Sequence, residues 1–311
     1  MNAAFKGYLL GTVAAATYGM NPLFALPLYE AGMNADSVLF FRYLLAIPLL
    51  AAMLCARRGP RSLLLRRHEV VPLVGMGLLT ALSSLTLFES YNYMAAGIAS
   101  TLLFVYPILT ALLMALFFGE RLSLHTWLCI AVAMGGVGLL YKAEDGSTLS
   151  ATGTLLAMAS ALTYAVYLVG VNRTRLRDSA TLKVTLYVLF FGLFLFAGRL
   201  LAGGGLCVPA RWYQWGNLVA LAVFPTAISF LCTTTAIRYI GSTPTAILGA
   251  LEPVTALVIG VLVFDESLTP RDLLGLTLVI GSVTLVIGGG GLSRSLLRIR
   301  KLFPRLVRRS R

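Results

Sequence analysis

Three charged residues, Arg42, Glu89 and Glu252, stand out among those inside the long apolar stretches of this 311-residue sequence. Placing a charge at the centre of a membrane helix costs about 2.5 to 3.5 kcal/mol on translocon-insertion scales, so such side chains are expected to face protein or a water-filled path. They are scattered along the chain, and no nucleophile stands beside a base at a usable spacing. The chemistry that they predict is therefore the binding of a charged group or a proton.

Glu252 is near the middle of its apolar stretch and directly precedes Pro253. Proline has no backbone N–H and its ring clashes with the preceding turn, so a helix carbonyl one turn earlier is left free. A carboxylate beside such a broken turn at the membrane midplane suits an amine or a proton. The alternative is structural, with Glu252 capping freed backbone donors or pairing with a neighbouring hydroxyl. The sequence leaves both interpretations open.

Arg42 and Glu89 are expected at a similar depth in the membrane. Arg42 lies about six residues from the end of its apolar stretch, and Glu89 lies near the end of the next one on the same side, where each helical residue advances about 1.5 Å. One interpretation is an ion pair between them or contact with the interface. The other is that they handle substrate or protons.

Uncharged polar residues add further candidates, among them Thr17-Tyr18, Thr163-Tyr164 and Asn21. Polar side chains on inner helix faces either line a path or hydrogen-bond between packed helices, and packing is the simpler explanation. The candidate substrate-binding or coupling residues are Glu252, Tyr106, Tyr18, Tyr164, Asn21, Glu89 and Arg42, and the candidate helix breaks are Pro107 and Pro253.

A metal or cofactor site is not expected. The four cysteines form no CxxC spacing, and the two histidines are far apart in the sequence. The chain also lacks the GxxxxGK[ST] motif that binds nucleotide phosphates. Any uphill movement of a substrate would therefore draw on a substrate or ion gradient.

The elements that carry these residues are predicted to be membrane helices. Hydrophobic residues make up 58% of the chain and charged residues 12%, with a mean hydropathy of +0.86, whereas a soluble domain has about 25% charged residues. A helix needs about 20 consecutive apolar residues to cross a bilayer, and barrel strands would alternate instead. Ten such stretches run approximately from 6 to 28, 36 to 56, 70 to 91, 94 to 118, 123 to 142, 152 to 171, 181 to 201, 214 to 236, 243 to 264 and 271 to 289.

The net charge of +13 is a topology signal rather than evidence for nucleic-acid binding. Of the 25 Lys and Arg residues, 8 follow Gly291 in a basic amphipathic tail, and most others lie between apolar stretches. With the N-terminus in the cytoplasm, 20 of them fall inside and 4 outside. The positive-inside rule therefore predicts that both termini are cytoplasmic and that the protein lies in the cytoplasmic membrane.

The two halves of the chain repeat one another at an offset of 146 residues. Each half has five apolar stretches, an odd number, so the second half enters the membrane inverted, as in many secondary transporters. The sequence thus predicts an all-α membrane protein with ten transmembrane helices, built as two inverted five-helix repeats (1–145 and 146–290) around a central cavity and followed by the tail 291–311. The pairs that share the register include Gly7 with Gly153, Thr17-Tyr18 with Thr163-Tyr164, Tyr93 with Tyr239, Pro107 with Pro253, Glu120 with Glu266, and Gly135 with Gly281.

Two corresponding segments resemble a known family. They are AAGIASTLLFVYPILTALLMALFFGERLS in the first half and GSTPTAILGALEPVTALVIGVLVFDESLT in the second. With Pro107, Pro253 and the Glu-bearing ends of the fourth and ninth stretches, they resemble the EamA-type branch of the drug/metabolite transporter superfamily over residues 5 to 290. The resemblance implies two bundles around a cavity, alternating access, and export or import of small metabolites such as amino acids. Tyr106 stands where the second-half motif has Glu252.

The expected function is a secondary transporter for a small metabolite, with an amino acid or related amine as the preferred cargo and export as the preferred direction. The partners are then a small-molecule substrate, the lipid bilayer and, as a candidate coupling ion, protons, with no nucleic acid and no cofactor. The alternative is an intramembrane enzyme that acts on a lipid or isoprenoid-linked substrate. The scattered charges disfavour it, because such an enzyme would cluster them.

Overall fold

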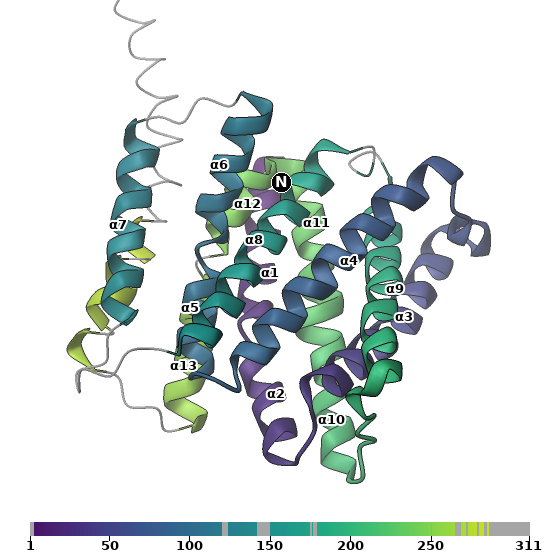
Figure 1. Ribbon diagram of the computed structural model, residues 1–311. Coiled ribbons are helices and arrows are strands. Elements are labelled where there is room, and N and C mark those ends of the chain that lie inside the picture. Colours follow the sequence, from purple (N-terminus) through teal and green to yellow (C-terminus); the bar gives the residue numbers. More distant parts are fainter. Residues whose placement is uncertain are drawn as a thin grey trace, which may run out of the picture.

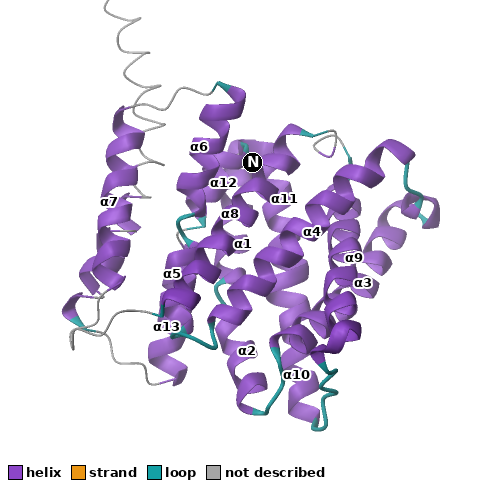
Figure 2. Cartoon of the chain, in the orientation of Figure 1, coloured by secondary structure: helices purple, strands orange, loops and turns teal. Residues whose placement is uncertain are grey.

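The computed structural model describes residues 3–119, 124–141, 150–174, 176, 179–249, 251–264, 269–271, 273–278, 280–282 and 285. Within these ranges every regular element is a helix (Figures 1 and 2). The boundary expected near residue 145 and the tail 291–311 lie outside them.

The helices of the first half follow its five apolar stretches, two of which are each divided between two consecutive helices. They are α1 (Ala3–Tyr18), α2 (Asn21–Glu30), α3 (Ala35–Arg58), the short 3-10 helix η1 (Pro60–Leu63), α4 (Arg67–Ser90), α5 (Ala96–Leu103), α6 (Tyr106–Phe118) and α7 (Leu124–Tyr141).

The second half also follows its apolar stretches, but its first stretch forms a single helix and two π-helical segments are added. Its elements are α8 (Ala151–Arg173), α9 (Thr181–Arg199), η3 (Leu200–Gly204), α10 (Trp212–Leu221), η4 (Ala222–Ile228), α11 (Ser229–Ile240), α12 (Ser242–Leu248), α13 (Leu251–Phe264) and a shorter apolar helix, Leu273–Ser282.

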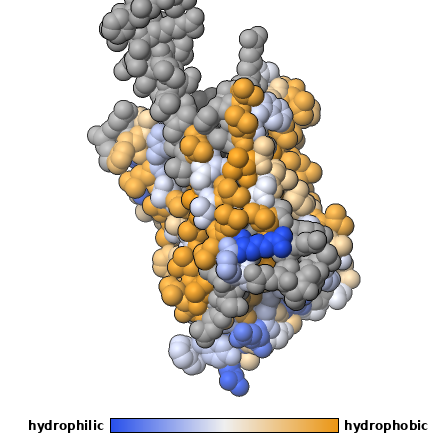
Figure 3. Space-filling model, turned by 90° about the vertical axis from the view of Figure 1, so that its left-hand side faces the viewer, coloured by the Kyte–Doolittle hydropathy of each residue, from blue (hydrophilic) through white to orange (hydrophobic). Residues whose placement is uncertain are grey.

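Within the described residues, eight helical segments are long and apolar enough to cross a membrane. Together with α7 and Leu273–Ser282, they bring the described part of the chain to between eight and ten apolar helices, which confirms an all-helical membrane fold. Leu116 and Leu262, equivalent in the repeat, are 77% and 76% exposed, as expected of side chains that face lipid. In Figure 3 most of the coloured surface on one side of the molecule is hydrophobic, with a hydrophilic group about half-way down and further hydrophilic residues at the lower end.

The repeat is visible in where the helices break. Adding 146 to the ends of α5–α6, 96 and 118, gives 242 and 264, which are the ends of α12–α13. Both segments break in the middle, and Pro107 and Pro253 lie at the second and third positions of the helices that follow. A proline in the first turn costs little, because its missing N–H would have no helical partner there.

The helix contacts between the halves obey the same offset. α1 packs on α11, and its repeat equivalent α8 packs on α4. In the second contact the Ser83 hydroxyl donates to the Ser160 carbonyl at 3.1 Å, and in the first the Ser229 hydroxyl donates to the Ala14 carbonyl at 2.9 Å. Positions 83 and 229, and positions 14 and 160, are repeat equivalents, so the two halves are related by an approximate two-fold rotation.

Glycines allow these close helix contacts. A Cβ on Gly7 would lie 2.8 Å from the Cβ of Tyr239, and a Cβ on the equivalent Gly153 would lie 3.0 Å from the Cβ of the equivalent Tyr93. In Figure 1, α1 runs downward from the N-terminus, whereas α8 begins at the lower end and runs upward. The equivalent helices therefore run in opposite directions.

The two halves differ at two places near the centre. α8 is continuous where α1 and α2 are separated at Gly19–Met20, and α4 is continuous where η4 adds a π-helical turn around Pro225. A Cβ on Gly19 would lie 2.5 Å from the Glu252 carbonyl oxygen, so only glycine permits this approach. Both irregularities border the residues that form the candidate site.

Candidate substrate-binding site

Tyr106 and Glu252 meet at the centre of the bundle. The Tyr106 hydroxyl donates to Glu252 Oε1 at 3.1 Å, and both side chains are buried. The residues stand 146 apart, at the start of α6 and of α13, so equivalent positions of the two repeats contact each other. The second carboxylate oxygen, Oε2, is buried without a hydrogen-bond partner in the described part of the chain. One oxygen is thus held by a hydroxyl while the other is free to accept a donor.

Gly249 leaves the space that the Tyr106 hydroxyl occupies. A Cβ added to Gly249 would overlap that hydroxyl. The Tyr106 ring also packs edge-on against Phe104, with centroids 5.9 Å apart and an interplanar angle of 86°. The break before α13 therefore brings a glycine, rather than a larger side chain, against the tyrosine that binds Glu252.

Tyr18 and Tyr164, a second pair of repeat equivalents, also meet. Their rings stack with centroids 6.1 Å apart and an interplanar angle of 9°. Tyr106 packs edge-on against Tyr164 at 4.8 Å, so the aromatic contacts continue from Tyr18 to the residue that binds Glu252. Such pairs contribute roughly 0.5–1.5 kcal/mol beyond the burial of their area.

Tyr167 and Phe230 extend this aromatic cluster and were not among the candidates from the sequence. The Tyr167 ring lies 5.9 Å from that of Tyr164, and the Phe230 ring lies 6.3 Å from that of Tyr18. Tyr167 was detectable, because it follows Tyr164 by three residues and so shares its helix face. Phe230 carries no such signal, since its repeat equivalent is a serine, Ser84.

Arg42 is fully buried and bonded to the π-helical segment η4. Its Nε donates to the Thr226 hydroxyl and its Nη2 donates to the Pro225 carbonyl at 3.2 Å. Pro225 lacks the N–H that would otherwise bond the Leu221 carbonyl, and the Thr226 hydroxyl donates to that carbonyl at 2.7 Å. The Arg42 Nη1 has no partner within the described ranges. The guanidinium carbon lies 6.0 Å from the centroid of the Tyr18 ring.

The ion pair considered between Arg42 and Glu89 is not formed, and that interpretation was wrong. Glu89 Oε2 instead accepts from Asn92 Nδ2 at 3.1 Å, and Glu89 Oε1 lies 3.8 Å from Arg199 Nη2. Arg42 lies over the ring of Phe88, the neighbour of Glu89, with 5.4 Å to the centroid. Consecutive residues point about 100° apart around a helix of 3.6 residues per turn, so Glu89 faces away from Arg42.

Asn21 begins α2 directly after the Gly19–Met20 break, and it is buried. Its Oδ1 has no partner in the described structure, and the same holds for the hydroxyl of its repeat equivalent, Tyr167. Leaving a buried polar atom unpaired costs about 1–3 kcal/mol. Within the described residues, buried polar atoms of Arg42, Glu252, Asn21, Tyr167 and Tyr91 are therefore left without hydrogen-bond partners.

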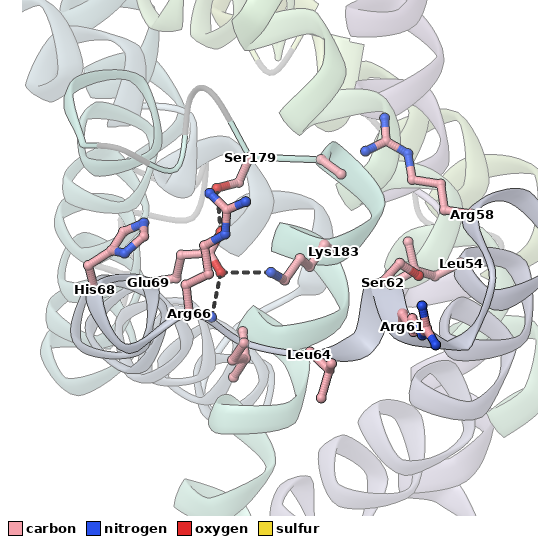
Figure 4. Close-up of a pocket in the computed structure, with 12 residues that line it drawn as sticks. Leu54, Arg58, Arg61, Ser62, Leu64, Arg66, His68, Glu69, Ser179 and Lys183 are labelled. Carbon is pink, nitrogen blue, oxygen red and sulfur yellow. Dashed lines mark hydrogen bonds and ion pairs between the residues drawn. The ribbon is translucent and has the colours of Figure 1, made fainter.

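Ion pairs tie α9 to the first half at both of its ends. At the start, Lys183 Nζ donates to Glu69 Oε2 at 2.7 Å, and the Ser179 hydroxyl donates to Oε1 at 2.9 Å (Figure 4). At the other end, Arg199 donates to both Asp36 carboxylate oxygens at 2.7 and 3.1 Å. Among the described residues, no group of three or more His, Cys, Asp or Glu side chains is arranged to hold a metal ion.

Comparison with known proteins gives one consistent family. Residues 5–142 and 151–288 each match the EamA-like transporter family. The chain is 28% identical over 237 residues to YvbV, an uncharacterized transporter of Bacillus subtilis, covering 73% of this chain and 75% of that protein. It is 32% identical over 225 residues to the uncharacterized transporter sll1319 of Synechocystis, covering 68% and 65%.

A third relative has a named substrate. The chain is 26% identical over 226 residues to the Escherichia coli threonine/homoserine exporter RhtA, covering 72% of this chain and 73% of that protein. A solved crystal structure with 21% sequence identity shares the fold, with a TM-score of 0.68 over 93% of this chain and 98% of that one. The family and these relatives are transporters, which excludes the intramembrane enzyme. With both halves matched, the chain belongs to the EamA-like transporter family and is an integral membrane protein built from two EamA repeats.

Proposed function

We propose that this protein is a secondary transporter that moves a small amino compound, preferably an amino acid, across the cytoplasmic membrane by alternating access, with export as the preferred direction. The substrate would bind between the two repeats, among Glu252, Tyr106, Tyr18, Tyr164 and Arg42. A route between the halves is the arrangement found in secondary transporters with inverted repeats.

One observation carries the proposal: two opposite charges are buried near the same aromatic cluster, and each keeps an unpaired atom. Glu252 Oε2 and Arg42 Nη1 both lack hydrogen-bond partners among the described residues, and the side chains are 5% and 0% exposed. Charges buried in a membrane protein are costly unless they are paired. An amino acid would bring an ammonium group to the carboxylate and a carboxylate to the guanidinium. The tyrosine rings between them can also contact a cation.

The relative RhtA supports both the cargo and the direction, because it is named as an exporter of two amino acids, threonine and homoserine. Its identity of 26% supports the chemical class rather than the particular side chain transported. Protons are the proposed alternative occupant of Glu252, since a carboxylate that binds substrate and proton in turn couples the two movements.

The proposed topology has ten spans, with repeats at 1–145 and 146–290, the tail 291–311, and both termini in the cytoplasm. The positive-inside distribution of Lys and Arg supports this orientation. The basic connection from α3 to α4 lies at the same end of the molecule as the N-terminus, as both termini in the cytoplasm would require (Figure 1).

The test is uptake of radiolabelled amino acids and organic cations into proteoliposomes, with and without an imposed pH gradient. The wild type is compared with Glu252→Gln and with Glu30→Gln, a matched change at an exposed carboxylate that ends α2. We expect saturable uptake of an amino acid by wild type and Glu30→Gln, and its loss in folded Glu252→Gln. Full transport by Glu252→Gln, or no uptake of any amino acid by the wild type, would contradict the proposal.

A further inference from the structure

A basic cavity opens at the end of the molecule where α3 passes to α4. Its volume is about 690 Å³, and it lies between the end of α3, the short helix η1, the start of α4 and the start of α9 (Figure 4). The cavity is separate from the tyrosine cluster and shares no residue with it. It is lined by Leu54, Arg58, Arg61, Ser62, Leu64, Leu65, Arg66, His68, Glu69, Ser179, Ala180 and Lys183.

The cavity carries an excess of positive charge. Among the described residues that line it, Glu69 is the one acidic residue, and its carboxylate already accepts from Lys183, Ser179 and the Arg66 backbone N–H, at 2.7, 2.9 and 3.0 Å. The pair of Glu69 and Lys183 is therefore neutral. The guanidinium groups of Arg58, Arg61 and Arg66 form no ion pair with any acidic residue in the described chain, and Figure 4 shows Arg58, Arg61 and Arg66 drawn from different segments around the cavity.

A second, smaller cavity continues this basic surface. It has a volume of about 400 Å³, shares Leu54, Arg58 and Ala180 with the first cavity, and adds Lys6 and Arg57 to its lining. Arg58 thus stands between the two cavities. The positively charged side chains therefore line a concave surface, rather than extending separately into water.

Apolar side chains stand beside the arginines around this cavity. Leu54 and Leu65 line the cavity, and Leu64, which also lines it, is 71% exposed. Val71, one turn into α4, is likewise exposed. A free inorganic anion would use the guanidinium groups alone. A phospholipid would use both features, with its phosphate at the arginines and an acyl chain along the exposed apolar residues.

We infer that this cavity binds the phosphate headgroup of an anionic phospholipid of the surrounding leaflet. Arg58, Arg61 and Arg66 hold the phosphate, while Leu64 and Val71 contact an acyl chain. Basic pockets between helices on the cytoplasmic side are the general form of such sites. The inference does not depend on the identity of the transported substrate, so it stands or falls separately from the proposed function.

The test titrates the purified full-length protein in detergent with short-chain phosphatidylglycerol or phosphatidylcholine and follows bound lipid by native mass spectrometry. The variant is Arg58→Gln/Arg61→Gln/Arg66→Gln, and the control is Arg211→Gln, which removes an exposed arginine outside the cavity. We expect wild type and control to prefer phosphatidylglycerol. The triple variant should lose the preference on the order of 100-fold, because each basic side chain near an anionic lipid contributes about a fivefold factor.

Competition with inorganic phosphate separates the two sources of a phosphate group. Millimolar phosphate should leave phosphatidylglycerol bound if the acyl chain contributes, whereas displacement by phosphate alone would overturn the lipid assignment. Equal binding of the two lipids by wild type, or unchanged binding in the triple variant, would also overturn it. If the triple variant does not fold, Arg61→Gln replaces it, with a loss of about fivefold expected.

Discussion

Tyr106 and Glu252 occupy equivalent positions in the two repeats and are hydrogen-bonded to each other at 3.1 Å. A two-fold rotation brings equivalent residues together only next to its axis, so this contact lies at the axis. The tyrosine is the donor and the carboxylate is the acceptor. Two copies of one ancestral position therefore have complementary roles, which leaves a single carboxylate at the centre rather than two carboxylates that would repel each other.

Tyr106→Phe should destabilise the protein by about 1–3 kcal/mol, because it leaves Glu252 Oε1 buried without its donor. Thermal unfolding in detergent measures the change. Tyr167→Phe is the matched control, since its hydroxyl has no partner within the described residues and its loss should cost little or nothing. Equal unfolding temperatures for the two variants would show that the Tyr106 hydroxyl does not stabilise the folded state.

Gly249→Ala should cost about 1–3 kcal/mol of stability, because its methyl group would overlap the Tyr106 hydroxyl and force the tyrosine to shift. Gly75→Ala should be neutral or stabilising by up to about 1 kcal/mol, since nothing lies within 4 Å of a Cβ at that helical position. Thermal unfolding compares the two.

Combining Gly249→Ala with Tyr106→Phe tests the same contact, because phenylalanine removes the atom that the methyl group would meet. The double variant should be more stable than the sum of the two single effects predicts. Strict additivity would place the cause of the Gly249→Ala effect elsewhere in the α12–α13 break.

Arg42→Gln should change which substrates are transported as well as how fast. If the guanidinium binds the substrate carboxylate, the wild type prefers an amino acid over the amine that lacks the carboxylate, and Arg42→Gln loses that preference. A lost hydrogen bond to a charged group, about 1.5–3 kcal/mol, corresponds to roughly a 10- to 150-fold loss of affinity for the amino acid. The preference is measured in proteoliposomes, by competition of the amino acid and of the amine against labelled substrate. An unchanged preference in a folded variant would exclude carboxylate binding by Arg42.

The two ion pairs at the ends of α9 should differ in strength. Glu69 and Lys183 are mostly buried, at 7% and 13% side-chain exposure, so Glu69→Gln is expected to cost about 1.5–3 kcal/mol. The Arg199 side chain is 49% exposed, so Asp36→Asn should cost about 0.2–1 kcal/mol. Thermal unfolding at low and high salt should show the Asp36→Asn effect shrinking with salt, because solvent ions screen the exposed pair more strongly. A larger loss of stability in Asp36→Asn than in Glu69→Gln would contradict this prediction.

Several residues of the central cluster could be predicted from the sequence, because equivalent positions of two inverted repeats can meet next to the two-fold axis. Tyr18, Tyr164, Tyr106 and Glu252 were candidates on residue type and register, and the structure brings them into one cluster. Helix depth was also predictable, since residues advance a constant distance along a helix. Arg42 and Phe88 are at the same level, as the counting of residues from the helix ends implies.

The partner of Arg42 was not predictable, because it depends on rotation about the helix axis and on an irregular turn. Counting residues along the chain predicts the depth of a side chain in the membrane, but it does not predict which face of α4 meets α3. The expected partner of Arg42 is therefore Glu89, whereas its neighbour Phe88 makes the contact. The π-helical turn at Pro225 and Thr226 exists because the Thr226 hydroxyl bonds a carbonyl that the proline leaves free, and Arg42 then bonds the same hydroxyl. No one of these three residues indicates the arrangement by itself.

From the sequence alone it was possible to predict the lipid environment, the apolar helices, the repeat and the family, because these follow from hydropathy and from a register that runs along one dimension. Which side chains pair could not be predicted in this way. Pairing depends on the rotation and packing of helices that are distant in the sequence. Glu252 is therefore hydrogen-bonded to Tyr106, and Arg42 is hydrogen-bonded to Thr226 rather than paired with Glu89.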